Sequence, residues 1–480
     1  MPEVSMKKAV AWTAAAKYTT AVLQLVFAAI LSRILTPEQY GTVAVITVFV
    51  VFFQLFCDMG FGTAVIQDKE LTPKQTNDIF SWTLYLGLAL QLMFIGASFP
   101  ISKFYDDPIY IPLGLILSFS LLLNALNMIP NAVMLKQKRF KTITIRTVVS
   151  NVLTSLFTVY LAFKGLGVYA LVLHTLLSSL IIFVWNEVTV KLRPNMKPDF
   201  SVIKRIWGYS VYQFLAQLLN YFNRNLDQLL IGKFFSRADL GQYNKSYHLM
   251  QMPISYIPGV VGPAMHPILS EHQNDPHFIY TAYMKIVKLL SLLGCFISVY
   301  LYYTGGEIVI LLFGHQWYSA ILPFKILALS IWFQILINTV GPIYLSLGNT
   351  KLMFLSTLIC SIMILSFIIL GSVMGSIVMV AACVSFAYFL NFFLGYYIMI
   401  KHALHDNYAK FLFSFRHEIV IFAILMALTF IPLNIENIVI LFFAKSLMIT
   451  ICYIGILVLT KQYKPLLALL PARFREKTKG

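Results

Sequence analysis

The sequence predicts an all-α integral membrane protein that crosses the bilayer many times. Of its 480 residues, 59% are hydrophobic and only 11% are charged, whereas an ordinary soluble domain carries about 25% charged residues. Apolar runs of about 17 to 25 residues recur from one end of the chain to the other, and each could cross a hydrocarbon layer about 30 Å thick as a helix. Most Lys and Arg residues lie in the breaks between these runs, which is typical of membrane proteins.

Polar breaks divide the chain into fourteen candidate spans. They cover residues 9–31, 41–57, 79–99, 109–129, 147–163, 167–185, 207–231, 243–263, 284–303, 320–340, 352–371, 376–400, 418–432 and 437–459. The first run contains Lys17 and is followed by a polar turn rather than a small-residue cleavage site. We therefore expect it to be a retained helix and not a signal peptide.

The distribution of basic residues predicts the orientation of the chain. With a cytoplasmic N-terminus, the internal segments hold most of the Lys and Arg residues. The external turns then hold only Arg33, Lys103, Lys164, Lys233 and Arg237. This split satisfies the positive-inside rule and places both termini of a multi-pass protein in the cytoplasm. Because it also explains the formal net charge of +17, we expect no nucleic-acid partner.

The sequence carries no recognisable signal for a metal site, a cofactor or catalysis. The cysteines lie within or at the end of apolar runs, without the spacing of a zinc site or a disulfide framework. They are Cys57, Cys295, Cys360, Cys383 and Cys452. No P-loop, HExxH sequence or nucleophile elbow occurs. We therefore expect a non-enzymatic protein, and any transport must draw on a gradient or on the supply of substrate.

A short motif occurs twice, 200 residues apart. LTPEQYG at residues 35–41 follows the first span, and FSRADLG at residues 235–241 follows the seventh. Both are typical of a helix start, with a hydroxyl residue at the N-cap and an amide or acid three positions later.

The equal placement of the two motifs predicts a duplication. The expected parts are two parallel six-helix bundles, residues 1–200 and 201–400, related by an axis along the membrane normal. Residues 401–480 would add two transmembrane helices and a basic cytoplasmic tail.

The seventh span is polar along one face. Its polar residues follow steps of four and three, which confines them to roughly 80° of the helix circumference at about 100° per residue. They are Gln213, Gln217, Asn220, Arg224 and Asp227. An Arg near the bilayer centre costs about 2.5 to 3.5 kcal/mol on insertion scales, so it should face a water-filled cavity or a partner.

The first span repeats this pattern at the 200-residue offset. The matching residues are Thr13, Lys17, Thr20 and Gln24. The two stripes are predicted to line a central cavity of positive potential, suited to an anionic headgroup. In that cavity Asp227 is the candidate for ion coupling.

Other interpretations of these residues stay open. Arg224 and Asp227, one turn apart, would neutralise each other as an intrahelical pair that holds helices together, or would line a substrate path. Lys17 would either snorkel to the cytoplasmic interface or face the cavity. Lone polar residues in other spans are typical of interhelical hydrogen bonds. They are Asn124, Asn127, Asn151, His174 and Asn391.

Several stretches in order along the chain carry a family resemblance. They are LSRILTPEQYG at 31–41, DMGFG at 58–62, GLGVYAL at 165–171, DQLLIG at 227–232, LGQYN at 240–244 and PILS at 267–270. In these stretches the sequence resembles the polysaccharide transporter branch of the multidrug/oligosaccharidyl-lipid/polysaccharide (MOP) flippase superfamily, the Wzx-like O-antigen and exopolysaccharide flippases.

The resemblance implies two six-helix bundles that form a V-shaped cavity, as in MATE-like transporters. It also implies movement of an undecaprenyl-pyrophosphate-linked oligosaccharide from the cytoplasmic to the outer leaflet of the bacterial plasma membrane. Alternating access would be driven by proton or sodium antiport, with membrane lipids and polysaccharide polymerase machinery as further partners. A basic cavity suits this substrate because guanidinium binds phosphate oxygens bidentately.

Two alternative functions belong to other classes of protein. A multidrug or cation antiporter of the same superfamily would place acidic groups in the cavity. A membrane polysaccharide polymerase or ligase would carry a large external loop with a catalytic Arg or His, and the longest external loop here, around residues 304–319, offers only His315.

Overall fold

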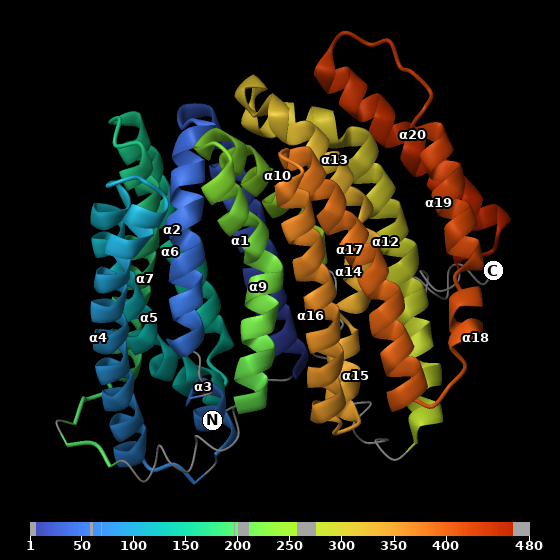
Figure 1. The fold of residues 1–480 in the computed structure, drawn as a ribbon. Helices are drawn as coiled ribbons and strands as arrows, with labels where there is room; N and C mark the ends of the chain where they lie inside the picture. Colours follow the sequence, from blue (N-terminus) through green and yellow to red (C-terminus); the bar gives the residue numbers. More distant parts are fainter. Residues whose placement is uncertain are drawn as a thin grey trace. The chain divides into compact units, whose positions relative to one another are not determined.

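A computed structural model describes residues 6–57, 61–68, 70–195, 197–199, 211–256 and 275–463. These ranges contain helices and the turns between them, and no strand, as the all-α prediction requires (Figure 1). The chain divides into two compact units, Met1–Gly241 and Gln242–Gly480.

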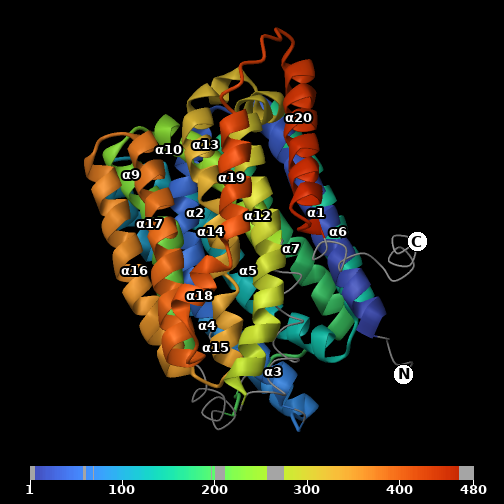
Figure 2. The same cartoon turned by 90° about the vertical axis from the view of Figure 1, so that its right-hand side faces the viewer.

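The first unit contains eight helices among its described residues and the start of a ninth. They are α1 (Met6–Ile34), α2 (Pro37–Cys57), α3 (Phe61–Gln67), α4 (Pro73–Phe104), α5 (Tyr110–Lys136), α6 (Phe140–Phe163), α7 (Val168–Val190), α9 (Val211–Phe234) and the first turn of α10 (Arg237–Tyr256). The most extensive packing joins α4 to α5, α5 to α7 and α1 to α6. Figure 2 shows α1 and α6 side by side.

The second unit contains the rest of α10 and a longer series of helices. They are α12 (Pro276–Phe313), η1 (His315–Ala320), α13 (Ile321–Leu329), α14 (Ile331–Ile337), α15 (Val340–Ser346), α16 (Thr350–Val373), α17 (Ile377–Ile398), η2 (Met399–Ala403), α18 (Tyr408–Phe413), α19 (Arg416–Leu428) and α20 (Ile438–Leu459). The long α12 lies at the centre of the packing in this unit, because α13, α14, α19 and α20 all pack against it.

The helices confirm a multi-pass membrane protein. Within the described ranges, eleven helices are long and apolar enough to cross a membrane, or twelve if one bent pair is a single span. Helices α9 and α10 occur where the seventh and eighth spans are predicted, but they are too polar to be counted by composition. The count of fourteen spans therefore stays a prediction.

The predicted single span 320–340 is divided in the structure. Helices α13 and α14 meet at Ser330, and the segments on either side of it are bent by 47°. The Ser330 hydroxyl donates to the Leu327 carbonyl at 2.6 Å, and the Thr339 hydroxyl donates to the Leu336 carbonyl at 2.6 Å. Such bonds compete with the helical hydrogen bonds of the backbone, which explains why the span breaks at these residues.

The two copies of the repeated motif form the same cap. In the first copy, the backbone N–H of Gln39 donates to the Thr36 hydroxyl and its side-chain amide oxygen accepts from the Thr36 N–H. Ser236 and Asp239 exchange the equivalent bonds. The predicted helix starts of α2 and α10 are therefore confirmed.

The two motifs also touch each other through their glycines. A Cβ atom on Gly41 would overlap the carbonyl oxygen of Arg237, and a Cβ atom on Gly241 would overlap that of Pro37. The contact is reciprocal at equivalent positions of the two motifs. The boundary between residues 200 and 201 falls outside the described ranges, so the predicted three-part division stays a prediction.

Helix α20, the last one within the described ranges, is attached to α12 by polar contacts. Lys445 of α20 pairs with Glu307 at 2.6 Å, and the Tyr453 hydroxyl donates to the Leu292 carbonyl at 3.0 Å. Both Glu307 and Lys445 are largely buried, and breaking such a pair costs far more than breaking an exposed one. The predicted spans 418–432 and 437–459 overlap α19 and α20, which pack within the second unit.

Candidate functional site

The polar stripe of the seventh predicted span lies on α9. Gln217, Asn220 and Arg224 are exposed along one side of this helix, as the spacing of four and three predicts. Asp227, at the end of the stripe, is only 1% exposed. The side chain of Gln213 lies outside the described residues.

The face of α9 next to the stripe packs against α2 (Figure 1), and aromatic rings make this contact. The ring centroids of Phe52 and Tyr221 are 5.5 Å apart, and those of Phe56 and Phe214 are 5.4 Å apart. The Tyr221 hydroxyl donates to the Val48 carbonyl at 2.9 Å. Because this apolar face holds the helix in place, α9 presents its amides and its guanidinium on an exposed surface.

The predicted external end of α9 is closed against the turn between α4 and α5. The Tyr105 hydroxyl donates to the Leu229 carbonyl at 3.2 Å, Lys233 pairs with Asp106, and Arg237 pairs with Asp107. The stripe is therefore exposed around Gln217. Beyond Asp227, the helix is packed against the α4–α5 turn and held there by ion pairs.

The two ion pairs of this closed end are expected to differ in strength. The Asp107 side chain is 10% exposed, whereas that of Asp106 is 82% exposed. Asp107→Asn should lower the free energy of unfolding by about 2 kcal/mol, because the partly buried charge-assisted bond to Arg237 is lost. Asp106→Asn, the matched control, should change it by less than about 0.5 kcal/mol. Thermal melting of the purified full-length variants tests this, and equal melting temperatures would show that the Asp107 pair does not hold this end.

The polar stripe of the first span lies on α1. Lys17 and Thr20 are half-buried and Gln24 is exposed, and the side chain of Thr13 lies outside the described residues. The main neighbour of α1 is α6, and the Thr144 hydroxyl donates to the Trp12 carbonyl at 3.1 Å. The two stripes thus lie on helices with different main neighbours, and their convergence on one cavity stays a prediction.

A buried polar network within the first unit was not predicted. Arg146, expected in a cytoplasmic segment, is a residue of α6 with only 6% of its surface exposed. Its guanidinium donates to the side-chain oxygens of Asn186 at 2.5 Å and Asn131 at 3.1 Å, and Asn186 in turn donates to Asn127 at 2.8 Å. Only the asparagine spacing of α5, at positions 124, 127 and 131, signals this network in the sequence.

The lone polar residues of the other spans behave largely as predicted. Asn127 donates to the Ser179 carbonyl, and Asn124 accepts from the Ser179 hydroxyl, so both link α5 to α7. His174 lies 3.5 Å from the Thr154 hydroxyl and links α7 to α6. Asn151 instead donates within its own helix, to the Thr147 carbonyl.

The fold is similar to those of solved transporters. A structure of the lipid II flippase MurJ in an inward closed conformation aligns with a TM-score of 0.75 at 15% identity, over 94% of this chain and 98% of that one. An inward-facing multidrug resistance transporter of the MATE family and MOP superfamily aligns with a TM-score of 0.63 at 13% identity, over 80% and 95% of the two chains. At this level of identity the likeness concerns the fold.

Sequence relatives come from polysaccharide biosynthesis. The teichuronic acid biosynthesis protein TuaB of Bacillus subtilis is 25% identical over 72% of this chain and 71% of its own length. The lipopolysaccharide biosynthesis protein WzxC of Escherichia coli is 20% identical over 84% and 82%. The succinoglycan biosynthesis transport protein ExoT of Rhizobium meliloti is 22% identical over 87% and 84%. The family model described as "Polysaccharide biosynthesis protein" matches residues 30–322, more than half of the chain, and the chain therefore belongs to this family, as its sequence resemblance indicated.

Proposed function

We propose that this protein is a flippase that moves an oligosaccharide repeat unit, linked to a polyprenyl lipid through pyrophosphate, from the cytoplasmic to the outer leaflet of a bacterial plasma membrane. Two kinds of similarity support this. Three curated relatives are named for the biosynthesis of teichuronic acid, the biosynthesis of lipopolysaccharide and the biosynthesis and transport of succinoglycan. The fold is that of a lipid II flippase over nearly the whole chain. Movement by alternating access fits this fold.

The composition of the exposed stripe on α9 is the observation that carries the proposal. Gln217 and Asn220 offer hydrogen-bond donors and acceptors to sugar hydroxyls, and Arg224 offers a planar guanidinium to phosphate oxygens. These side chains are exposed, and in the predicted topology α9 crosses the membrane, where polar groups are unfavourable unless they face water or a ligand. On α1, Lys17 adds a second cation and Thr20 and Gln24 add polar groups.

A multidrug or cation antiporter of the same superfamily is less consistent with this stripe. An antiporter that binds organic cations needs a carboxylate on the substrate side of the helix. The carboxylate of the stripe, Asp227, is the buried member, and its oxygen accepts the backbone N–H of Gln228 at 2.8 Å. The exposed members are neutral or cationic, which favours an anionic substrate. We assign ion coupling, by proton or sodium, to Asp227.

The function is tested in cells that lack their own flippase for a surface polysaccharide but retain the enzymes that assemble the repeat unit. Expression of this protein should restore the polysaccharide at the surface and remove the lipid-linked repeat units that accumulate in the inner leaflet. Accumulation that persists while the protein is abundant in the membrane would reject the proposal. Assembly of polymer from exogenous flipped repeat units would instead identify a polymerase.

The proposed topology places both termini in the cytoplasm. A reporter fused after Gly371, the end of the predicted span 352–371, should lie outside, and a reporter fused after Gly480 should lie inside. Activities of alkaline phosphatase and green fluorescent protein fusions at the two positions provide the measurement. An external C-terminus would show that the count of spans is odd.

A further inference from the structure

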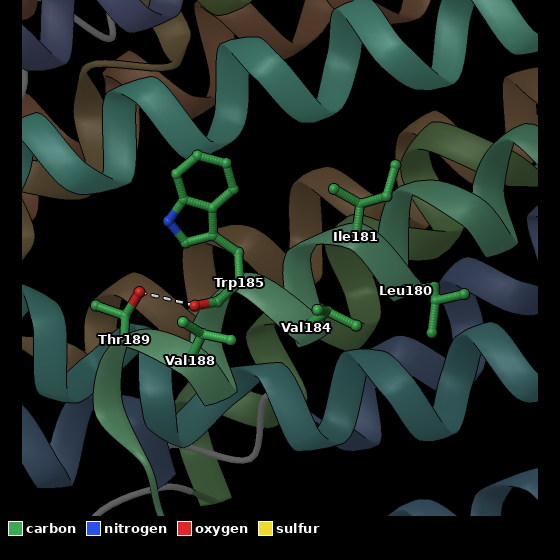
Figure 3. A pocket seen from close by; sticks show the side chains of 6 residues that line it. All are labelled: Leu180, Ile181, Val184, Trp185, Val188 and Thr189. Atoms are coloured by element: carbon green, nitrogen blue, oxygen red, sulfur yellow. Dashed lines mark hydrogen bonds between the residues drawn. The ribbon is translucent and has the colours of Figure 1, made fainter.

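An apolar groove runs along the outer face of α7. It has a volume of about 520 Å³ and is lined by Leu180, Ile181, Val184, Trp185, Val188 and Thr189. Figure 3 shows Ile181 and Trp185 projecting to the same side of the helix. Leu180, Val184 and Val188 are exposed. In a membrane this surface is open to the hydrocarbon chains of lipids.

The length of the groove matches one leaflet. From residue 180 to residue 189 the helix rises by about 14 Å at 1.5 Å per residue. Half of a hydrocarbon core about 30 Å thick is about 15 Å. An acyl chain of a phospholipid that belongs to one leaflet therefore fits the groove along its whole length, with its headgroup at the Thr189 end.

The Thr189 end of the groove is basic. The Arg139 guanidinium donates to the Thr189 carbonyl at 3.4 Å, which brings the turn between α5 and α6 to this end. Lys138, Arg139 and Lys191 are all exposed there, and the acidic residue nearby on α7 is the half-buried Glu187. This combination of an apolar channel and a cationic end is complementary to a lipid with a negatively charged headgroup.

We propose that the α7 groove binds one anionic phospholipid, with an acyl chain along Leu180 to Val188 and the headgroup phosphate at Arg139 and Lys191. In the predicted orientation this lipid belongs to the cytoplasmic leaflet, where anionic headgroups attract basic segments. Binding here is independent of the transport activity proposed above, since it uses neither the α9 stripe nor the α1 stripe.

Trp185 provides a direct probe of this lipid. The full-length protein is reconstituted in phosphatidylcholine vesicles that contain increasing fractions of dibrominated phosphatidylglycerol, whose bromine atoms quench nearby tryptophans. The contribution of Trp185 is the difference between the wild type and Trp185→Phe. Dibrominated phosphatidylglycerol is expected to quench it at a mole fraction at least about fivefold lower than dibrominated phosphatidylcholine, the preference that one cation supplies near a membrane surface.

Variants at the basic end separate specific binding from general contact with lipid. Arg139→Gln combined with Lys191→Gln should abolish the preference for phosphatidylglycerol. The control, Lys401→Gln with Lys410→Gln, removes two exposed lysines of the second unit and should leave the preference intact. Three results would overturn the proposal. The two lipids could quench the wild type equally, neither lipid could quench Trp185, or the preference could survive the Arg139 and Lys191 changes. Because the experiment measures fluorescence and not export, the lipid-binding proposal can fail while the proposed transport function stands.

Discussion

Replacing Arg224 by alanine is expected to lower polysaccharide export by about thirtyfold without lowering the amount of protein in the membrane. The guanidinium is exposed on the polar face of α9, so its removal leaves no cavity in the packed interior. A charge-assisted hydrogen bond to a phosphate contributes about 2 kcal/mol, and a loss of that size corresponds to about thirtyfold. The measurement is surface polysaccharide in flippase-deficient cells, scored beside the level of the variant in the membrane.

Two further variants of α9 serve as comparisons. Arg224→Lys keeps the charge but loses the bidentate fork, so its export should lie between those of the wild type and the alanine variant. Leu215 lies nine residues earlier, on the opposite side of the helix at about 100° per residue, and Leu215→Ala should export normally. Full export by an abundant Arg224→Ala variant would remove this residue from the mechanism.

Asp227→Asn distinguishes the two interpretations of the neighbouring carboxylate. If Asp227 serves mainly to pair with Arg224 and hold helices together, the variant should be scarce in the membrane. If it couples transport to an ion, the variant should be abundant and inactive. Asp227 is 1% exposed. The comparison of abundance is informative because a packing defect at a buried residue would lower the amount of the variant in the membrane.

Adding one methyl group at Gly41 is expected to reduce the folded protein severalfold. The Cβ of Gly41→Ala would overlap the Arg237 carbonyl, a rigid backbone group, and overpacking of this kind costs about 1–3 kcal/mol. Gly241→Ala should have the same effect, because its Cβ would overlap the Pro37 carbonyl at the same contact. Fluorescence-detected size-exclusion chromatography of the tagged variants measures the folded fraction.

Gly96 provides the matched control for this prediction. It also lies in a helix of the first unit, α4, but a Cβ atom there would meet nothing within 4 Å. Alanine is favoured over glycine in helices by up to about 1 kcal/mol, so Gly96→Ala should be neutral or slightly stabilising. Normal yields of Gly41→Ala and Gly241→Ala would mean that the two motifs do not meet in the folded protein.

Local chemistry explains which parts of the fold were predictable. The caps at Thr36 and Ser236 use partners three residues away, and the stripe on α9 depends only on the helical period. The contact of Gly41 with Gly241 joins residues 200 positions apart. The capping residues therefore predict the two helix starts, but they do not predict that the two helix starts touch. The break at Ser330 was missed because hydropathy does not report a hydroxyl that bonds to its own helix.

The candidate site was predictable to the extent that it follows one helix. Exposure of Gln217, Asn220 and Arg224 agrees with the predicted face, but the burial of Asp227 depends on packing from outside α9. Arg146 shows the same limit. Its sequence neighbours are the basic residues of an internal segment, whereas Asn131 and Asn186, from two other helices, accommodate it in the interior.

The ion pair between Glu307 and Lys445 has a consequence for the order of biosynthesis. The two residues are 138 positions apart, so at a synthesis rate of about 5–20 residues per second Glu307 is made about 7 to 28 s before its partner. During that interval Glu307 has not yet met Lys445. Helix α20 carries no charged residue besides Lys445, so this lysine makes the charged contact of α20 with α12. The ion pair that attaches α20 to α12 therefore forms only after α12 to α19 have been made.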